Sequence, residues 1–323
     1  ADVNNDGFPD LYVCAHFISP DRFWINQGGK GVQAASRAAL SQSSWSSMCV
    51  DWADIDLDGD WDFFVGDMLS RNYQRRHYQR ANHTPNAWTD WAFEQRRQYM
   101  RNTVFLNRGD QTFAELGRFS GLAATEWTWN CLWLDVDRDG AEDLLITNGH
   151  PHDSLDSDWT GKIGALTAED PNARLRLPSL DTPNLAFRNQ GELRFTEKGA
   201  AWGFDAVTHG QGIAMGDLDR DGDQDIIVNP LNSSLELYEN IGSGNLIAVH
   251  LKDEISGRTI YGSKITLSGG KTSQIREFRA GGRYLSGDDS GVTFGTGDTV
   301  GPFELKVRWP DGETFIVSQI EPN

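Results

Sequence analysis

The chain has 323 residues, with 29 lysines and arginines against 47 aspartates and glutamates, so its formal net charge is −18. Nucleic acids and anionic membrane surfaces repel so acidic a chain, which excludes both as partners, whereas a divalent cation suits it well. No run of 18 apolar residues occurs, so the sequence predicts no membrane-spanning helix. The 34 glycines, the many aromatic residues and the scarcity of helical patterns favour an all-β fold.

One nine-residue pattern, D-x-[DN]-x-D-G-x-x-D, occurs four times and runs each time into a short apolar strand. The copies are numbered loops 1 to 4, with positions 1 to 9 in each: Asp2–Asp10, Asp54–Asp62, Asp135–Asp143 and Asp217–Asp225. An apolar strand also precedes every copy except the first. We therefore expect the chain to be truncated or processed at its N-terminus, so that any leader peptide would already be gone.

The spacing of the loops predicts calcium binding. Calcium takes six to eight hard oxygen ligands, and side chains at positions 1, 3 and 5 of a tight loop point inward. Position 6 turns sharply, which glycine allows, position 7 offers its carbonyl and the position 9 carboxylate closes the far side. The expected ligands are Asp2, Asn4, Asp6, Phe8 and Asp10; Asp54, Asp56, Asp58, Asp60 and Asp62; Asp135, Asp137, Asp139, Ala141 and Asp143; and Asp217, Asp219, Asp221, Asp223 and Asp225.

A polar hairpin turn is the alternative interpretation of any single loop, but four matching copies favour about four calcium ions. An EF-hand is unlike these loops, because apolar strands replace its helices and no glutamate stands at position 12. The loops hold 18 acidic residues, as many as the net negative charge of the chain. Since these carboxylates repel one another, we expect the cation to be required for folding.

An apolar strand ending in Asn-x-Gly follows each loop and predicts a hairpin. These segments are Phe23–Gly28, Val104–Gly109, Ala186–Gly191 and Leu237–Gly242. The repeated unit is thus a four-stranded blade, and the middle two blades carry insertions at about 69–101 and 149–182. Four such blades over residues 1–244 predict a calcium-binding β-propeller, with a small antiparallel β domain over residues 245–323.

The loops and hairpins resemble the FG-GAP, or VCBS, repeats of integrin-type propellers. The tail resembles the ASPIC/UnbV domain at Gly262–Ile265, Arg276-Glu277, Ala280–Ser286, Phe294-Gly295 and Val307–Gly312. Together they identify the chain as similar to the cartilage-acidic-protein-like (CRTAC/ASPIC) family. That resemblance implies a secreted or cell-surface protein and a ring of about seven blades, of which four are visible. Either residues before Ala1 supply the other blades, which we favour, or further copies of the chain do.

The first insertion interleaves arginines with aromatic residues, which suits either stacking on a polymer or carboxylate ligand or a helical cap whose arginines pair with the acidic loops. Helical periodicity places that cap at Trp91–Arg101. In the second insertion His150, His152 and Asp153 are candidate transition-metal ligands, although an ordinary polar turn explains them better. Trp127, Trp129 and Trp202 are expected to pack between blades, with a carbohydrate cleft as the alternative.

Cys14, Cys49 and Cys131 form no disulfide framework and are expected to be buried apolar residues, with an inter-blade disulfide or a soft-metal site as alternatives. In the tail we expect strands near Ile247–Leu251, Lys264–Leu267, Gln274–Arg279, Val292–Phe294 and Leu305–Trp309, a domain without calcium that packs on the last blade.

The predicted function is a non-catalytic extracellular scaffold for adhesion, matrix contact or assembly, with an extracellular protein, a polysaccharide or further copies of the chain as partners. The alternative is a propeller enzyme, a lyase or hydrolase acting on sugars or natural products near the insertions. No catalytic motif is present, and no catalytic residue is assigned.

Overall fold

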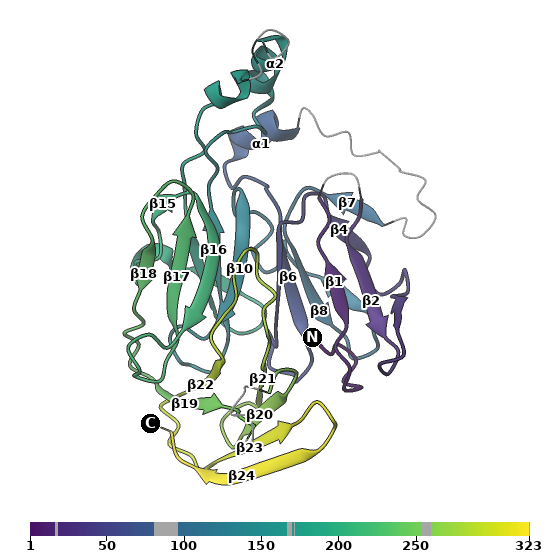
Figure 1. The fold of residues 1–323 in the computed structure, drawn as a ribbon, viewed down its shortest axis with the longest axis vertical. Helices are drawn as coiled ribbons and strands as arrows, with labels where there is room; N and C mark the ends of the chain where they lie inside the picture. Colours follow the sequence, from purple (N-terminus) through teal and green to yellow (C-terminus); the bar gives the residue numbers. More distant parts are fainter. Residues whose placement is uncertain (17–18, 81–95, 167–169, 171, 254–259, 323) are drawn as a thin grey trace.

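The computed structural model describes residues 1–16, 19–80, 96–166, 170, 172–253 and 260–322. Its main body consists of four antiparallel sheets that lie side by side (Figure 1). Sheet 1 contains β1 (Leu11–Val13), β2 (Arg22–Asn26) and β3 (Val32–Ala34), and sheet 2 contains β5 (Cys49–Ala53), β6 (Asp62–Gly66), β8 (Thr103–Asn107) and β9 (Phe113–Glu115). Sheet 3 contains β10 (Thr128–Leu134), β11 (Asp143–Asn148), β13 (Leu185–Asn189) and β14 (Phe195–Glu197), and sheet 4 contains β16 (Gly210–Gly216), β17 (Asp225–Pro230) and β18 (Glu236–Tyr238).

Both faces of the central sheets are buried, which explains the continuous apolar runs after the loops. All five residues of β6 and all six of β11 are buried. Successive side chains of a strand point to opposite faces, so each sheet offers one apolar row to each neighbour. Three clusters fill these interfaces, one between each pair of adjacent sheets. The first strands of sheets 2, 3 and 4 (β5, β10 and β16) also lie next to one another.

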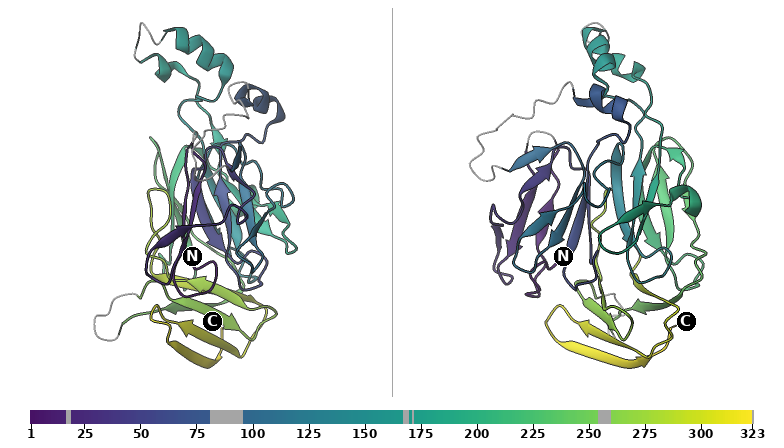
Figure 2. Two further views of the ribbon diagram at one scale, coloured as in Figure 1. Left: turned by 90° about the vertical axis from the view of Figure 1, so that its right-hand side faces the viewer. Right: turned by 180° about the vertical axis from the view of Figure 1, so that it is seen from behind.

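Two small sheets and short helices occupy the end opposite the aspartate loops (Figures 1 and 2). There β4 (Gln42–Ser44) pairs in parallel with β7 (Arg97–Tyr99), and β12 (Thr182–Pro183) pairs with β15 (Val207–Thr208). Helices α1 (Tyr73–Arg80) and α2 (Ser157–Leu166) touch each other, and η1 (Ala173–Arg176) packs on α2. The four-residue α3 (Gly199–Trp202) follows β14 instead. None of the described helices is long and apolar enough to span a bilayer.

The helix expected at the end of the first insertion is not where the periodicity placed it. The described part of Trp91–Arg101 contains β7, whereas the helix, α1, begins at Tyr73. Residues 91–95 lie outside the described residues. Backbone pairing with β4 overrides the local helical pattern here, because an extended segment gains hydrogen bonds from a neighbouring strand.

The C-terminal part forms two further antiparallel sheets across the loop end of the main body (Figure 1). One pairs β19 (Asn245–His250) with β22 (Gly291–Gly297). The other has the order β21 (Gln274–Glu277), β20 (Lys264–Ser268), β23 (Phe303–Arg308) and β24 (Thr314–Ile320). All five expected strands are present, and β24 is an additional one. The tail packs on the last blade, as expected, where Ser286 donates to the Ile213 carbonyl of β16. It also extends to loop 1, where Lys264 donates to Asn5, and to loop 3, where Gly295 lies beside Asp135.

Candidate metal-binding site

All four aspartate loops adopt the same backbone conformation. The position 6 glycines have φ between 94° and 99°, as the sharp turn requires: Gly7, Gly59, Gly140 and Gly222. Position 4 is also left-handed, with φ between 57° and 69°, although no glycine stands there: Asn5, Leu57, Arg138 and Arg220. The sequence pattern gave no signal for this second left-handed residue, because its identity varies among the copies.

Each position 1 carboxylate organises its loop by accepting hydrogen bonds from the loop backbone. Asp54 accepts from the N–H of Asp58 at 2.9 Å and from that of Gly59 at 3.0 Å. Equivalent bonds reach Asp2 and Asp135, and Gly222 donates to Asp217 at 3.2 Å. The two interpretations of the loops, a polar turn and a candidate metal site, therefore do not exclude each other. The hydrogen bonds that form the turn also bring the carboxylates close together.

Three loops bring three carboxylates into a metal-sized group. Oxygens within 4.8 Å of one another come from Asp54, Asp56 and Asp58; Asp135, Asp137 and Asp143; and Asp217, Asp219 and Asp221. Among the described residues the Asp2, Asp6 and Asp10 carboxylates of loop 1 do not form such a group, and the Asn4 amide there donates to Asp6 at 3.1 Å. Asp62 and Asp225 also stay outside the groups of their loops.

The chemistry of these groups fits a calcium ion. Carboxylate oxygens are the ligands that calcium prefers. One oxygen each of Asp137, Asp217 and Asp223 is buried without a hydrogen-bond donor. Burial raises the pKa of both Asp54 and Asp135 to about 7, although hydrogen bonds from the loop backbone act to lower it. A bound cation would pair with these buried oxygens.

The position 9 aspartates tie each loop to its own hairpin. One oxygen of Asp62 accepts the N–H of Ile55 at 2.9 Å, and the other accepts the N–H of Asn107 at 2.7 Å. The same two bonds recur at Asp10, Asp143 and Asp225. Burial raises the pKa of Asp62 to about 8 and that of Asp143 to about 9. Position 9 thus has a structural role that the metal-ligand interpretation did not include.

The hairpin asparagines connect adjacent sheets. The Asn107 side-chain amide of sheet 2 donates to the Val3 carbonyl of loop 1 at 3.0 Å. Asn189 of sheet 3 donates to Ile55 of loop 2 at 3.0 Å, and Asn240 of sheet 4 donates to Val136 of loop 3 at 3.2 Å. In each case the acceptor is the position 2 carbonyl of the preceding loop. The Asn-x-Gly motif therefore joins neighbouring sheets, and in sheets 2 and 3 it also forms the predicted hairpin.

Comparison with known families agrees with this repeated geometry. The family model for FG-GAP-like repeats matches residues 2–65 and 88–146, and the model for ASPIC and UnbV matches residues 254–323. The chain is an FG-GAP-repeat protein with a C-terminal ASPIC/UnbV domain. No curated protein matches it significantly. Sheet 4 lies outside the matched ranges. Its Asp225 and Asn240 nevertheless make the same bonds as the position 9 aspartates and hairpin asparagines of the matched repeats.

Basic side chains approach the FG-GAP loops, but they are not the expected ones. In the described part of the first insertion Arg71 pairs with Glu197, Arg75 with Asp153 and Arg101 with Glu115, so the predicted pairing of this insertion with the loops was wrong there. The loops are met by other residues instead. Arg188 of β13 contacts Asp137 and Asp139, Arg138 contacts Asp223, and Arg308 of the ASPIC/UnbV domain lies 3.6 Å from Asp2.

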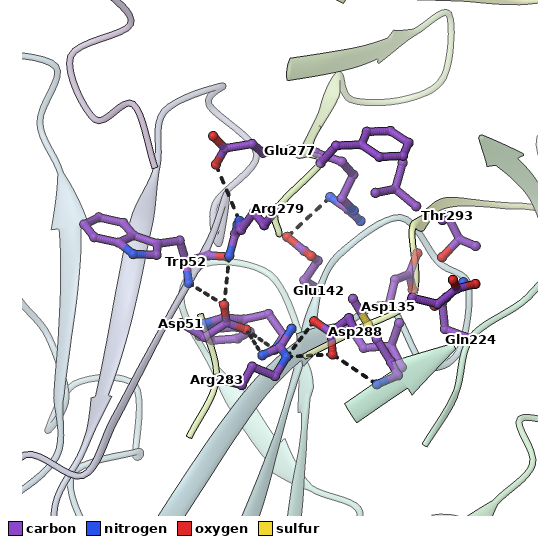
Figure 3. A pocket seen from close by; sticks show the side chains of 18 of the residues that line it. Asp51, Trp52, Asp135, Glu142, Gln224, Glu277, Arg279, Arg283, Asp288 and Thr293 are labelled. Atoms are coloured by element: carbon purple, nitrogen blue, oxygen red, sulfur yellow. Dashed lines mark hydrogen bonds and ion pairs between the residues drawn. The ribbon is translucent and has the colours of Figure 1, made fainter. Parts of the chain in front are cut away.

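An ion-pair cluster joins the ASPIC/UnbV domain to the inner strands of the repeats (Figure 3). Asp51 of β5 is buried between Arg279 at 2.9 Å and Arg283 at 2.7 Å. Burial alone would raise the pKa of Asp51, but the two guanidinium groups hold it below its ordinary value. Arg283 also pairs with Asp288 at 2.7 Å. These four charged side chains pair with one another, and we infer that they hold the ASPIC/UnbV domain against the repeats.

The segment that supplies these arginines, residues 279–290, runs along three repeats and is named the inner segment. Asn130 of β10 donates to the Tyr284 carbonyl at 2.9 Å, and the N–H of Asp289 donates to Met215 of β16 at 3.0 Å. With the Asp51 pair, this segment contacts β5, β10 and β16. The sequence motif at Ala280–Ser286 did not predict this path along the repeats, because its bonds join residues far apart in the chain.

The candidate transition-metal residues of the second insertion do not converge. His150 stacks on Trp127, with ring centroids 4.1 Å apart, and its Nδ1 accepts the N–H of His152 at 3.0 Å. Burial lowers the pKa of His150. Asp153 pairs with Arg75. In the described part of the chain neither histidine joins a group of three possible metal ligands, so the polar-turn interpretation holds for this structure.

The remaining candidates lie mostly in the core. Trp127 is buried and stacks near Trp129, whose ring also stacks on Tyr284 of the inner segment. Cys49 and Cys131 are free thiols, buried at the interface of sheets 2 and 3, as expected of small apolar residues. Burial and the neighbouring Cys49 raise the pKa of the Cys131 thiol well above its ordinary value. Cys14, also a free thiol, is partly exposed.

Proposed function

We propose that the protein is a calcium-stabilised β-propeller scaffold that works outside the cell in adhesion, matrix contact or assembly. The observation that carries the proposal is the gathering of three carboxylates in each of loops 2, 3 and 4. The position 1, 3 and 5 aspartates of loops 2 and 4, and Asp135, Asp137 and Asp143 of loop 3, would hold the ions. Calcium would neutralise these carboxylates and brace the loops against which the ASPIC/UnbV domain packs.

Calcium removal tests this function. A ligand bound only by the native state stabilises it by mass action, by about 2.7 kcal/mol at a concentration 100 times Kd. We expect excess EDTA to lower Tm and added calcium to restore it, with isothermal titration showing saturable heat. Asp56→Asn should weaken the binding step of loop 2 without lowering metal-free stability, because it removes repulsion. Asp311→Asn, in an exposed turn, is the matched control. An unchanged melt in EDTA together with no binding heat would contradict the proposal.

We propose further that the four sheets belong to a closed ring of about seven blades. The inter-sheet bonds support this: each runs from a hairpin asparagine to the position 2 carbonyl of the preceding loop. At one end of the series, the Asn26 amide of sheet 1 donates to Pro9 of its own repeat and to no preceding loop. At the other end, the position 2 residue of loop 4 is Leu218, and the described residues contain no fifth sheet whose asparagine could donate to it. Blades from a longer chain, or from further copies, would continue the series. A monomer of 323 residues after native purification would contradict ring closure.

The scaffold role implies binding surfaces rather than chemistry. In the cluster of Figure 3 Asp51 is paired with Arg279 and Arg283, and His150 of the second insertion is occupied by stacking on Trp127 and by a backbone bond. An extracellular protein or a polysaccharide is the proposed partner. Fractionation of the source cells should recover the protein from the medium or the cell surface, and recovery from the cytoplasm alone would count against this location.

A further inference from the structure

One edge strand of the ASPIC/UnbV domain is exposed along almost its whole length. In the sheet of order β21, β20, β23 and β24, the strand β24 forms the outer edge and lies at the margin of the molecule (Figure 1). Six of its seven residues are exposed. At the opposite edge of the same sheet, three of the four residues of β21 are buried, and Ile275 joins the core between sheets 1 and 2. The main body thus covers one edge of this sheet and leaves the other open.

The sequence of β24 contains none of the features that keep an edge strand from pairing with another chain. Those features are short length, charged side chains, proline and bulges. The outer edge strands of sheets 1 to 4 (β3, β9, β14 and β18) have only three residues each, whereas β24 has seven and includes neither a charged residue nor proline. Its one irregularity in register follows Ser318, so the pairing from Thr314 to Ser318 is regular. This stretch is therefore able to accept a further strand.

The hairpin between β23 and β24 shows which backbone groups of this edge are free. The N–H of Trp309 donates to the carbonyl of Glu313 at 2.8 Å, and hydrogen-bonded pairs recur at every second residue of an antiparallel ladder. The backbone groups of Phe315 and Val317 therefore bond β23. Those of the alternate residues point away from it, and no described strand pairs with them: Thr314, Ile316 and Ser318. An extended chain is what satisfies such a row of backbone donors and acceptors.

The side chains along the edge define the chemistry of a partner strand. Phe315, Ile316 and Val317 are 55%, 52% and 39% exposed. Phe315 and Val317 share a face with the buried residues of β23, so apolar residues opposite them in an added strand would pack on both. The exposed Glu313 and Glu321 flank the two ends of β24, whereas the cations of β23 lie one strand further from the edge. A basic residue near each end of the partner would complement the two glutamates.

We propose that the outer edge of β24 binds an extended segment of another protein, which joins the sheet as a further antiparallel strand. The segment has apolar residues at alternate positions and a basic residue near each end. A second copy of this chain fits less well. Pairing of two β24 strands about Val317 would place Glu313 of one copy opposite Glu321 of the other, and each copy has a net charge of −18. This inference rests on the proposed function, because it names the kind of protein that the scaffold contacts.

A nine-residue peptide tests this proposal on the full chain in calcium buffer. It alternates threonine and valine, with lysine at both ends and a fluorescein label. We expect fluorescence anisotropy to show saturable binding with a Kd below about 1 mM. Methylation of the amide nitrogens of the two threonines beside the central valine should weaken binding by about tenfold or more, because it removes two backbone donors. Glutamate in place of both lysines should weaken it by about fivefold at low salt, and high salt should reduce that difference.

Ile316→Lys tests the same edge from the side of the protein. It should weaken the lysine-ended peptide by about tenfold, because a charge on the open edge opposes strand addition and repels the basic ends. Leu175→Lys is the matched control, since Leu175 is also exposed and lies in η1, at the other end of the molecule. It should leave binding within about twofold of the wild type. The methylated peptide needs no protein variant, so the test does not depend on the folding of either one.

The proposal is overturned if the lysine-ended peptide does not bind saturably, if methylation leaves its binding unchanged, or if Ile316→Lys binds it as the wild type does. Sedimentation velocity provides a further control. A dimer that Ile316→Lys abolishes would identify a second copy as the occupant, which also overturns the proposal. Failure of the peptide to bind while EDTA still lowers Tm would overturn the strand site alone and leave the calcium-stabilised scaffold standing.

Discussion

The side-chain amide of Asn189 donates to the backbone carbonyl of Ile55 across a sheet boundary, at 3.0 Å. The two residues are 134 positions apart, and both are buried. The same bond joins the other adjacent sheets, which makes this asparagine the recurrent polar link between repeats. The free energy that this bond contributes to stability can be measured, because Asn26 stands at the same position in sheet 1 and does not bond a preceding loop.

Asn189→Ala should destabilise the protein by about 2 kcal/mol more than Asn26→Ala, because it leaves the Ile55 carbonyl buried and unpaired. The two asparagines make the same kinds of bond within their own repeats, although Asn26 is the more exposed of the two. Each accepts a glycine N–H in its own turn and donates to the position 8 carbonyl of its own repeat. Urea unfolding in calcium buffer measures the difference. Equal losses would show that the inter-sheet bond adds nothing.

Leu57→Asn should stabilise the protein by about 1 kcal/mol. Leu57 stands at position 4 of loop 2 with φ of 62°, a left-handed conformation that costs an ordinary residue about 1–2 kcal/mol and that asparagine tolerates. Asn5 occupies the same position in loop 1. Leu235→Asn is the control, since Leu235 is exposed and is not left-handed. A gain at both sites would show that replacing an exposed apolar side chain, and not relief of backbone strain, stabilises the protein.

Asp21→Asn should flatten the pH dependence of stability between pH 4 and 7. Asp21 is fully buried and accepts bonds from Tyr12, Ser47 and Ala15, and burial raises its pKa to about 6. Its unfolded pKa is about 3.9, so its contribution is complete below pH 4 and is lost as the pH rises through 6. The wild type should lose about 3 kcal/mol relative to the variant over this range. Parallel curves in saturating calcium would refute the assignment.

Arg283→Met should destabilise the protein by about 3–5 kcal/mol, because it leaves the buried Asp51 with only Arg279 and the partly exposed Asp288 without its cation. Arg176→Met is the control, since Arg176 forms an exposed pair with Asp170 and pairs of that kind contribute about 0–1 kcal/mol. Urea unfolding followed by tryptophan fluorescence measures both variants. Similar small losses would show that the inner segment is not held by its charges.

Local patterns in the sequence predicted the repeats well. The runs after the loops became β1, β6, β11 and β17, and the expected hairpins formed at the first three Asn-x-Gly segments. At the fourth, Gly242 makes the turn bond to Asn240, but among the described residues β18 pairs with no following strand, so the predicted hairpin and the fourth strand of that blade were wrong there. Turn chemistry and strand periodicity are short-range properties, so a single sequence carries them. The tail strand β24 was missed because nearly all of its residues are exposed, which hides the alternation that marks a half-buried strand.

The residues with which the charged and amide side chains pair could not be predicted in the same way. The sequence contains arginines and acidic loops, but only the fold shows that Arg188 and Arg308 approach the loops while Arg75 and Arg101 pair elsewhere. The double role of the hairpin asparagine was hidden for the same reason. Its acceptor belongs to the preceding repeat, and spacing within one repeat cannot reveal it.

The pairing of Arg283 with Asp51 has a kinetic consequence. These residues are 232 positions apart, and the arginine belongs to a segment that leaves the ribosome after all four sheets. The contact order of the inner strands is therefore high, and loop-closure entropy must be overcome before their packing is complete. Until then Asp51 has neither of its cations. Packing of the inner strands cannot be completed before residues 279–290 have been synthesised. The final folding step should therefore be slow and should follow synthesis of the tail.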